Sequence, residues 1–423
     1  MPNPTTTRIV ILGGGFGGAF SARHLEALSK DDPGLHITLI SRNNYFLMTP
    51  LLFEAGSGIL EPRHVVNPLR PLFKKTRFVE AEISAVDLDR RIVSVIPVDG
   101  EVDEIPYDHL VLALGGITNT TLIPGSEHAI RFKTLGDAIL LRNRVIQLFE
   151  RADVEKDPAK KQAQLTFVLV GAGLVNIELC GELTPFLSNL QKLYPRISIG
   201  DIHIEMIEGE PVIAREFDES LREYIAGILQ SRGVHIRLNT RVHKIEPGQV
   251  HLKDGPVIAA QTIILGTGVV PSPLVASLPI EKDRKGRAKT DPTLRCKGRQ
   301  DVWALGDCAE IPDPTGKPYP ELAQHALREA RVLAKNIIAS LRGQPLENFV
   351  YRTKGNLAAL GHGKGVGKIY KIRFRGFIAW WIWRTYYLFQ MRGWSRRIRV
   401  MLDWTTALFF KNDIVQLDVY DRK

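Results

Sequence analysis

Short segments rich in apolar residues lie near the start of the sequence. Residues 8–12 (RIVIL) form one such segment and residues 36–40 (HITLI) form a second, and we interpret both as strands. Between them lies the segment GGGFGG at residues 13–18, followed by a stretch that we interpret as a helix ending near Ser29. The pattern predicts a strand, a tight turn, a helix and a second, parallel strand, which is the start of an α/β fold.

The glycines of this turn stand where a dinucleotide-binding turn requires them. Gly13 permits the tight turn, Gly15 lets the backbone approach a pyrophosphate, and Gly18 lets the helix pack closely on the strand. The helix N-terminus would then face the phosphate charge. Ser41 and Arg42 replace the acidic residue that usually ends the second strand, so we expect ribose recognition to differ here. A tight strand–helix turn without a ligand is the alternative.

A second unit of the same kind begins near residue 165. Residues 165–170 form an apolar run, residues 171–176 read GAGLVN, and a further helix follows. Two glycine turns predict two dinucleotides. Gly171 and Gly173 keep the first two glycine positions, but Asn176 occupies the third, and we expect it to push the helix off the strand or to shift the turn.

The next strand, residues 202–207, ends at Glu208. A carboxylate at this position accepts both ribose hydroxyl hydrogen bonds and repels a 2′-phosphate, which favours NADH over NADPH. Alternatively, Glu208 is a solvated charge at the end of a strand, and Glu210 could share its role.

Composition limits the class of protein. A chain of 423 residues exceeds what one core normally serves, and 44% hydrophobic with 24% charged residues is ordinary for a globular α/β protein. The three cysteines, Cys180, Cys296 and Cys308, form no CxxC pair, which suits buried thiols in a reducing compartment. Residues 1–7 show no basic region with an apolar stretch, so we expect no secretory signal and a cytoplasmic location.

The last quarter of the chain concentrates aromatic and basic residues. Ten basic residues lie between Lys368 and Lys411 against Asp403 alone, which is nearly the whole formal net charge of +10. Residues 377–389 would make a helix of about 20 Å, interrupted by Arg384, whereas a bilayer core needs about 30 Å. We therefore expect attachment to a membrane surface, not a span. Five of the six tryptophans fall in this part of the chain, at Trp380, Trp381, Trp383, Trp394 and Trp404.

A second helix is predicted from Arg396 onward. Helical spacing puts the polar residues on one stripe and the apolar ones on the other side, a pattern typical of an interfacial helix on anionic lipid. Alternatively, both helices pack on the domains or form a dimer interface. Nucleic-acid binding is less expected, since no recognised module is visible. The polar stripe comprises Arg396, Arg399, Asp403 and Thr406, and the residues facing away are Ile398, Met401, Trp404 and Leu408.

Around the two glycine turns, the rest of the sequence resembles the type II NADH dehydrogenases, which are membrane-attached FAD enzymes that reduce quinone. The match covers nearly the whole chain and implies a glutathione-reductase-like fold. Its FAD-binding domain would comprise residues 1–125 and 286–345, its NADH-binding domain residues 126–285, and a C-terminal amphipathic helical membrane module residues 346–423. The segments that carry the resemblance are residues 44–52 (NYFLMTPLL), 113–116 (ALGG), 123–125, 133–138, 267–269 and 302–307 (VWALGD), together with Asn119.

The resemblance also implies roles for individual residues. Asp307 would bind the ribityl chain of FAD, although it could instead cap a following helix. Glu178 would lie near the nicotinamide and flavin, and Lys364 near the flavin, unless they are an exposed helix charge and a loop lysine. The quinone motif A-Q-x-A-x-Q is matched at Gln324 but not at Arg328, which brings a fixed charge near the acceptor. The expected FAD contacts are Gly13, Gly15, Phe16, Gly17, Gly18, Ser41, Arg42, Ile83, Ala113, Gly115, Asp307 and Gln324. The expected NADH contacts are Gly171, Gly173, Leu174, Val175, Glu208 and Gly268.

The implied activity is hydride transfer from NADH to FAD, then transfer of two electrons to a membrane quinone, without proton pumping and without a metal. A peripheral homodimer on the cytoplasmic face of the cell membrane, held to anionic lipid through residues 368–411, is expected. A sulfide:quinone oxidoreductase is one alternative, but it needs paired redox cysteines, and Cys308 directly follows Asp307 with no well-placed third cysteine. Disulfide reductases are disfavoured because no CxxxxC follows the first unit. A flavin-containing NADH sensor on membranes is the second alternative.

Overall fold

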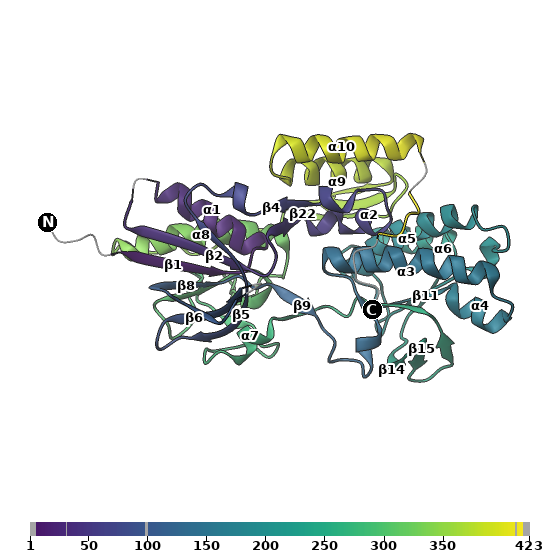
Figure 1. Cartoon of the computed structure of the whole chain (residues 1–423), viewed down its shortest axis with the longest axis horizontal. Helices are drawn as coiled ribbons and strands as arrows, with labels where there is room; N and C mark the ends of the chain where they lie inside the picture. Colours follow the sequence, from purple (N-terminus) through teal and green to yellow (C-terminus); the bar gives the residue numbers. More distant parts are fainter. Residues whose placement is uncertain (1–5, 31, 98–99, 411–412, 418–423) are drawn as a thin grey trace. The chain divides into compact units, whose positions relative to one another are not determined.

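The computed structural model of the protein describes residues 6–30, 32–97, 100–410 and 413–417. The chain folds into two compact units, each assembled from separate stretches of sequence (Figure 1). Unit 1 comprises Met1–Phe46, Asn67–Ile117 and Val269–Thr353, and unit 2 comprises Leu47–Val66, Thr118–Gly268 and Lys354–Lys423. The chain passes between them five times: at or next to four short strands, β3 (Tyr45–Leu47), β4 (Val66–Pro68), β9 (Gly116–Thr118) and β18 (Val269–Pro271), and between Thr353 and Lys354.

Unit 1 is built on a seven-stranded sheet in the order β20-β8-β1-β2-β5-β6-β7. The first five strands are parallel and the last two run antiparallel as a hairpin extension. Helices α1 (Phe16–Leu28) and α8 (Ala323–Leu341) pack against each other beside the sheet (Figure 1). The strands are β1 (Thr7–Leu12), β2 (Leu35–Ser41), β5 (Arg77–Asp87), β6 (Ile92–Pro97), β7 (Asp103–Pro106), β8 (His109–Leu112) and β20 (Val302–Ala304); β19 (Ala288–Lys289), β21 (Ala309–Glu310) and helix α7 (Pro273–Ser277) complete the unit.

Unit 2 contains a five-stranded parallel sheet in the order β10-β17-β11-β12-β13. All five residues of its central strand β11 are buried, as the apolar run predicts. Its sheet strands are β10 (Ile130–Arg131), β11 (Thr166–Val170), β12 (His203–Ile207), β13 (Val234–Arg237) and β17 (Thr262–Leu265); its helices are α2 (Leu52–Gly56), α3 (Leu135–Val154), α4 (Pro158–Gln164), α5 (Leu174–Gln191) and α6 (Glu219–Ser231); and β14 (Val242–Glu246), β15 (Gln249–Leu252) and β16 (Val257–Ala259) form a small antiparallel sheet.

The C-terminal part of unit 2 forms a separate layer, which we call the C-terminal module. It consists of the antiparallel strands β22 (Gly355–Ala359), β23 (Gly365–Ile369) and β24 (Ile372–Arg375), then α9 (Phe377–Gln390) and α10 (Trp394–Phe409), which lie side by side (Figure 1). The module packs on the five-stranded parallel sheet of unit 2. Its residues Ala358, Leu360 and Val366 belong to the same hydrophobic core as that sheet. Within the described ranges, no helix has the length and apolarity that a membrane crossing requires.

A sheet with five parallel strands in unit 1 and a parallel sheet in unit 2, each with a strand, a glycine turn and a helix, confirm the predicted α/β class. The helix ending near Ser29 is also confirmed, because Ser29 is the C-cap of α1 and its backbone N–H donates to Leu25 O. Residues 1–5 and Lys411, the last of the ten counted basic residues, lie outside the described residues.

Candidate cofactor and substrate sites

The first glycine turn leaves space for a phosphate. The backbone of Gly13 has φ +107°, and a methyl group there would overlap the carbonyl oxygen of Ala113. A methyl group on Gly18 would overlap the carbonyl oxygen of Gly13, whereas one on Gly15 would meet no atom within 4 Å. Gly15 is the N-cap of α1 and no side chain caps it, so the first N–H groups of the helix remain for an anion. This turn fits the pyrophosphate of FAD.

Neighbouring residues shape the same turn. Gly17 packs against Leu305, and a methyl group on Gly17 would crowd that side chain at 3.1 Å. The Phe16 ring stands edge-on to Phe46, with centroids 4.8 Å apart. Gly115 has φ +63° and open space where a side chain would be. Packing contacts therefore surround Phe16 and Gly17, whereas the space next to Gly115 is open.

The end of β2 carries Ser41 and Arg42 in place of an acidic residue. Arg42 forms an exposed ion pair at 3.5 Å with Glu82 of β5. Ile83 follows Glu82 at a register shift in the β5–β6 pairing and is partly buried. Sequence reasoning missed Glu82, because its distance of forty residues from Arg42 leaves no local signal.

Asp307 lies in a 3-10 helix, Gly306–Cys308, between β20 and β21. Its expected alternative role, capping a following α-helix, is wrong, since the next helix α8 begins at Ala323 with Leu322 as its N-cap. Glu329 of α8 accepts a hydrogen bond from Gly306 N at 2.8 Å and is buried, and burial together with Asp307 raises the pKa of Glu329 to about 8. Glu329 thus fixes the turn that presents Asp307. It was not anticipated from the sequence.

The second glycine turn is open in the same way as the first. Gly171 has φ +92°, and Gly173, the N-cap of α5, has open space beyond its α-carbon. Leu174 and Val175 form the first turn of α5, where their backbone N–H groups are available to a phosphate. Gly268, with φ +83°, is equally open at the end of the neighbouring strand β17.

Asn176 ties helix α5 to the turn. Its amide nitrogen donates to Val170 O at 2.9 Å and to Gly171 O at 2.8 Å. Room for the side chain comes from Gly266, where a methyl group would overlap the Asn176 amide. Gly171 N donates to Ile207 O at 2.7 Å, matching the bond from Gly13 N to Ile40 O at 2.8 Å in the first turn. A methyl group at Gly18, the matching position of the first turn, would overlap Gly13 O, so the expected shift of the helix or turn at Asn176 stays a prediction.

Glu208 is held against this turn and is not a free strand-end charge. Its Oε2 accepts a hydrogen bond from Ala172 N at 2.7 Å and its Oε1 accepts one from Glu210 N at 3.1 Å. Arg215, which is exposed, lies within 4 Å of both Glu208 and Glu210. The carboxylate is thus oriented at the mouth of the turn, where ribose hydroxyls would meet it.

Glu178 is buried on α5 and is not an exposed helix charge. Its Oε1 accepts hydrogen bonds from Ala359 N at 3.0 Å and Trp383 Nε1 at 3.1 Å, so the C-terminal module holds it in place. Burial raises the pKa of Glu178 to about 8. Glu182, one turn later, is buried as well, and its carboxylate oxygens have no hydrogen-bond partner among the described residues. Burial therefore favours the protonated form of the Glu178 carboxyl at neutral pH.

A second buried carboxylate joins residues 47–66 to the C-terminal module. Glu54 of α2 is 0% exposed and receives hydrogen bonds from Arg384 Nη2 at 2.8 Å and Trp404 Nε1 at 2.7 Å. The Arg384 guanidinium also lies over the Trp380 and Trp404 rings, 4.0 and 4.6 Å from their centroids. We call this group the Glu54 clamp. Arg384, which interrupts an apolar stretch in the sequence, is therefore a structural residue.

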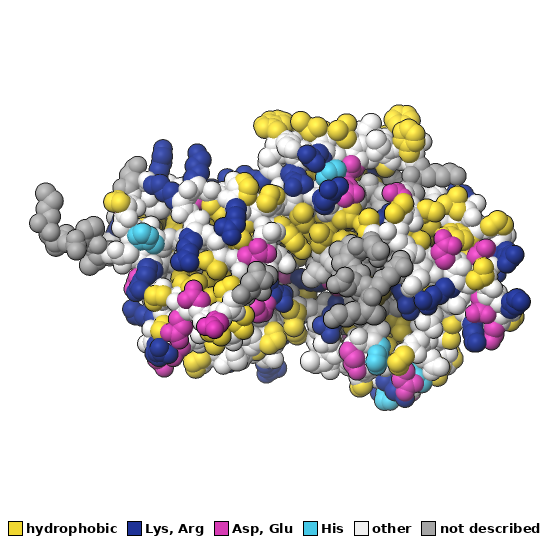
Figure 2. All heavy atoms as spheres, in the orientation of Figure 1, with side chains coloured by type: hydrophobic (Ala, Val, Ile, Leu, Met, Phe, Trp, Pro, Cys, Tyr) yellow, Lys and Arg dark blue, Asp and Glu magenta, His cyan; other side chains and the backbone are white. Residues whose placement is uncertain are grey.

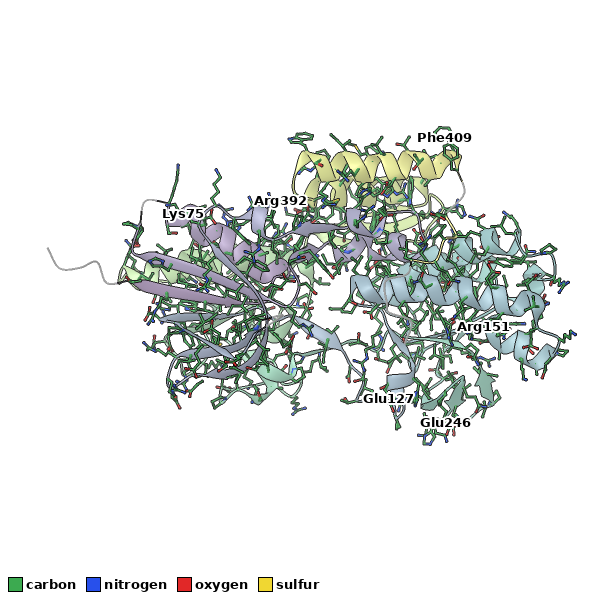
Figure 3. The ribbon with its side chains drawn as sticks, in the orientation of Figure 1. Lys75, Glu127, Arg151, Glu246, Arg392 and Phe409 are labelled. Atoms are coloured by element: carbon green, nitrogen blue, oxygen red, sulfur yellow. The ribbon has the colours of Figure 1, made fainter. Side chains whose placement is uncertain are left out.

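The predicted faces of the last helix are partly wrong. Trp404 points inward and is 8% exposed, because Glu54 receives its indole N–H. Asp403 also faces inward, where it lies 2.6 Å from His64 Nδ1. Leu408 and Ile398 face outward as expected. Figure 2 shows hydrophobic side chains gathered along α10 at the top of the view, and Phe409, labelled in Figure 3, ends that face.

Gln324 begins α8 in unit 1, and Tyr351 Oη donates to its Oε1 at 3.1 Å. Arg328 is turned onto the Tyr351 ring, 4.4 Å from its centroid. Lys364 is exposed in the loop between β22 and β23, where its backbone pairs with Leu360 and Gly361. Gln324 thus belongs to unit 1, while Glu178 and Lys364 belong to unit 2.

The three cysteines are free and buried. Burial raises the pKa of Cys180 and of Cys308 to about 12 and raises that of Cys296 further, so all three thiols stay protonated at neutral pH. Protonated buried thiols are poor nucleophiles. No group of three or more potential metal ligands is found in the described part of the chain.

These sheets and turns define a class of protein. A family model described as pyridine nucleotide-disulphide oxidoreductase matches residues 7–330, and one described as the NDH2 C-terminal domain matches residues 353–413. The class is therefore the pyridine nucleotide-disulphide oxidoreductases.

Relatives narrow the class. The chain is 31% identical over 416 residues to a probable NADH dehydrogenase of Dictyostelium discoideum, covering 96% of this chain and 90% of that one. It is 30% identical over 439 residues to a type II NADH:quinone oxidoreductase of Mycobacterium tuberculosis, covering 99% and 92%. The fold matches NDH2 of Plasmodium falciparum, solved with NADH, with a TM-score of 0.90 over 97% and 100% of the chains at 20% identity. The chain belongs to the type II NADH dehydrogenases, as the resemblance predicted.

Proposed function

We propose that this protein oxidises NADH and passes two electrons to a quinone, with FAD as its resident cofactor and without pumping protons. One observation carries the proposal. Two glycine turns, open at Gly15 and at Gly173, each lie between a strand and the N-terminus of a helix. One follows a strand of the sheet in unit 1 and the other a strand of the sheet in unit 2. The Mycobacterium tuberculosis relative is named as a quinone oxidoreductase, which supports the choice of acceptor.

Each unit would hold one nucleotide. In unit 1 the turn at Gly15 would receive the FAD pyrophosphate and Asp307 the ribityl hydroxyls. In unit 2 the turn at Gly173 would receive the NADH pyrophosphate, while Glu208 accepts the ribose hydroxyl hydrogen bonds. The chemistry that FAD supplies when bound is acceptance of a hydride from NADH and delivery of two electrons to the quinone.

The remaining candidate residues serve the acceptor. Gln324 would donate a hydrogen bond to a quinone carbonyl through its amide N–H. Formation of the quinol from NADH and quinone consumes one proton per turnover, and Glu178, whose pKa is raised to about 8 by burial, can hold that proton at neutral pH. Lys364 would supply a positive charge from the hairpin that also provides Ala359, a donor to Glu178.

Rapid mixing of the purified flavoprotein tests the proposal. NADH under anaerobic conditions should bleach the flavin absorbance, and a soluble quinone should restore it. Gly173→Ala should retain FAD but need about tenfold more NADH for half-maximal bleaching, which corresponds to about 1.4 kcal/mol of lost binding. Gly227→Ala, which also meets open space but lies within α6, should behave like the unaltered protein. Bleaching without reoxidation by quinone would indicate an NADH sensor instead.

We also propose that the C-terminal module attaches the protein to an anionic lipid surface, as a peripheral homodimer on the cytoplasmic face of the cell membrane. Support comes from the exposed apolar face of α9 and α10, where Phe409 is 77% exposed, and from the surrounding arginines, of which Arg392 is labelled in Figure 3. Aromatic and basic residues together suit the boundary between head groups and acyl chains. The exposed apolar residues include Phe377, Ile378, Trp381, Phe389, Trp394, Ile398, Leu402, Leu408, Phe409 and Phe410.

Flotation with vesicles distinguishes lipid from protein as the occupant of this face. Binding should require vesicles that contain phosphatidylserine and should weaken with salt, because surface charges are screened. The pair Leu408→Ser and Phe409→Ser should lose binding, while Leu122→Ser, an equally exposed leucine outside the module, should not. If the paired variant loses only self-association, measured by light scattering, the face is a dimer interface and not a lipid-binding surface.

A further inference from the structure

We propose that Tyr351 is a positioning residue for Gln324, and that Arg328 holds the Tyr351 ring in place for this purpose. The inference rests on the proposed reduction of quinone and names two residues that adjust how the acceptor is bound. Neither residue would touch the quinone.

The contacts form one interlocked group at the start of α8. Tyr351 Oη donates a hydrogen bond to Gln324 Oε1 at 3.1 Å. One helical turn after Gln324, Arg328 places its guanidinium 4.4 Å from the centroid of the Tyr351 ring, while its Nη1 donates to Gln324 O at 2.7 Å. A guanidinium over the face of a tyrosine ring is favourable. These contacts thus link the Gln324 backbone, the Gln324 amide and the Tyr351 ring.

The hydrogen bond from Tyr351 holds one end of the Gln324 amide. An amide carries one acceptor oxygen and one donor NH2, and rotation about its last bond exchanges them between two broad, nearly equivalent positions. With Oε1 accepting from the Tyr351 hydroxyl, the NH2 faces the opposite side. A quinone carbonyl only accepts hydrogen bonds, so the orientation with the NH2 outward is the productive one.

Other aromatic residues keep the Tyr351 ring from moving. His325 stands edge-on to it with ring centroids 5.1 Å apart, and Tyr351 N donates to Tyr319 Oη at 3.0 Å. Burial and the charge of Arg328 lower the pKa of His325 to about 4, so the imidazole is neutral at physiological pH. Arg328 is therefore the cation that faces the ring.

The position of Arg328 also accounts for its departure from the quinone motif. With Arg331, Val332 and Tyr351 it lines a surface cavity of about 360 Å³ on the outer side of α8. Its guanidinium lies over the Tyr351 ring. From the sequence, Arg328 was expected to bring a fixed charge near the quinone. In the structure it contacts Tyr351, the residue that we propose positions Gln324.

Steady-state kinetics with two acceptors test the role. Tyr351→Phe should raise the KM for a short-chain soluble quinone about fivefold to tenfold, the loss expected for one hydrogen bond. Turnover with ferricyanide, which accepts electrons without accepting a hydrogen bond from an amide, should stay unchanged, as should the rate of flavin bleaching by NADH. Arg328→Met should change the quinone KM in the same direction by a smaller factor, and it serves as the test if Tyr351→Phe does not fold.

Tyr194→Phe is the matched control. It also removes one tyrosine hydroxyl that donates to a side-chain oxygen, but the acceptor is Glu150 in unit 2 and not Gln324. An unchanged quinone KM in Tyr351→Phe, equal losses with both acceptors, or the same KM increase in Tyr194→Phe would each overturn the positioning role. An unaltered protein that reduces ferricyanide but no quinone would instead refute the proposed function, and the positioning role with it.

Discussion

Replacing Arg384 by methionine tests whether the Glu54 clamp fastens the C-terminal module to the rest of unit 2. Glu54 is 0% exposed, so removal of the guanidinium leaves a buried carboxylate with only the Trp404 indole N–H as a donor. Breaking one side of a buried ion pair costs about 3–5 kcal/mol. The two stacked rings at 4.0 and 4.6 Å add to this loss when the cation disappears.

Hydrogen exchange of the α9 amides is the suitable assay, because it reports local opening and not unfolding of the whole chain. Each 1.4 kcal/mol corresponds to a factor of ten, so Arg384→Met should speed α9 exchange by about a hundredfold to several thousandfold. The matched control is Arg373→Met, which breaks the exposed pair between Arg373 of the module and Asp218 at the start of α6. Exposed pairs contribute little to stability, so α9 exchange should change by less than about tenfold.

A double-mutant cycle separates the ion pair from the packing around it. Glu54→Gln removes the buried charge while keeping an oxygen that can accept from Trp404. Combined with Arg384→Met, it should restore at least half of the protection that Arg384→Met loses, expressed as free energy. Exchange in Arg384→Met within threefold of the unaltered protein, or a double variant no better than the single one, would refute the clamp.

Three further predictions concern the candidate sites. Glu208→Gln keeps an acceptor for Ala172 N but removes the charge, so the ratio of kcat/KM for NADPH to that for NADH should rise about tenfold or more; an unchanged ratio would count against ribose recognition by Glu208. Replacing Cys296 and Cys308 together by serine should leave quinone turnover intact, and loss of turnover would favour sulfide chemistry. Because the pKa of Glu178 is raised from 4.5 to about 8, the folded state binds its proton more tightly than the unfolded state does. Stability should therefore be lost as pH rises from 4.5 to about 8. The decrease in thermal unfolding temperature from pH 5 to pH 9 should be smaller in Glu178→Gln than in the unaltered protein. An equal decrease in both proteins would contradict this.

The glycine turns could be predicted because their requirements are local. Gly13 and Gly171 adopt positive φ, and the apolar runs before them are buried strands, so a few consecutive residues carry the signal. Glu208 was also within reach, since it directly ends a strand.

The residues that hold the sites together could not be predicted in the same way. Helical spacing separates the two faces of α10, but it does not say which face is covered. The buried partners Glu54 and His64 decide that, and they lie more than 300 residues away in sequence. Glu329 was not predicted either, because it lies 23 residues after Gly306 and no local pattern links the two positions.

The fit between Asn176 and Gly266 links two distant positions. A methyl group at 266 and an amide at 176 would occupy the same volume, so the two residues have to be exchanged as a pair. An attempt to convert the second turn to three glycines by changing Asn176 alone would open a void and remove two hydrogen bonds to the strand end. Redesign of nucleotide preference at this turn should therefore start from a library in which both codons vary together.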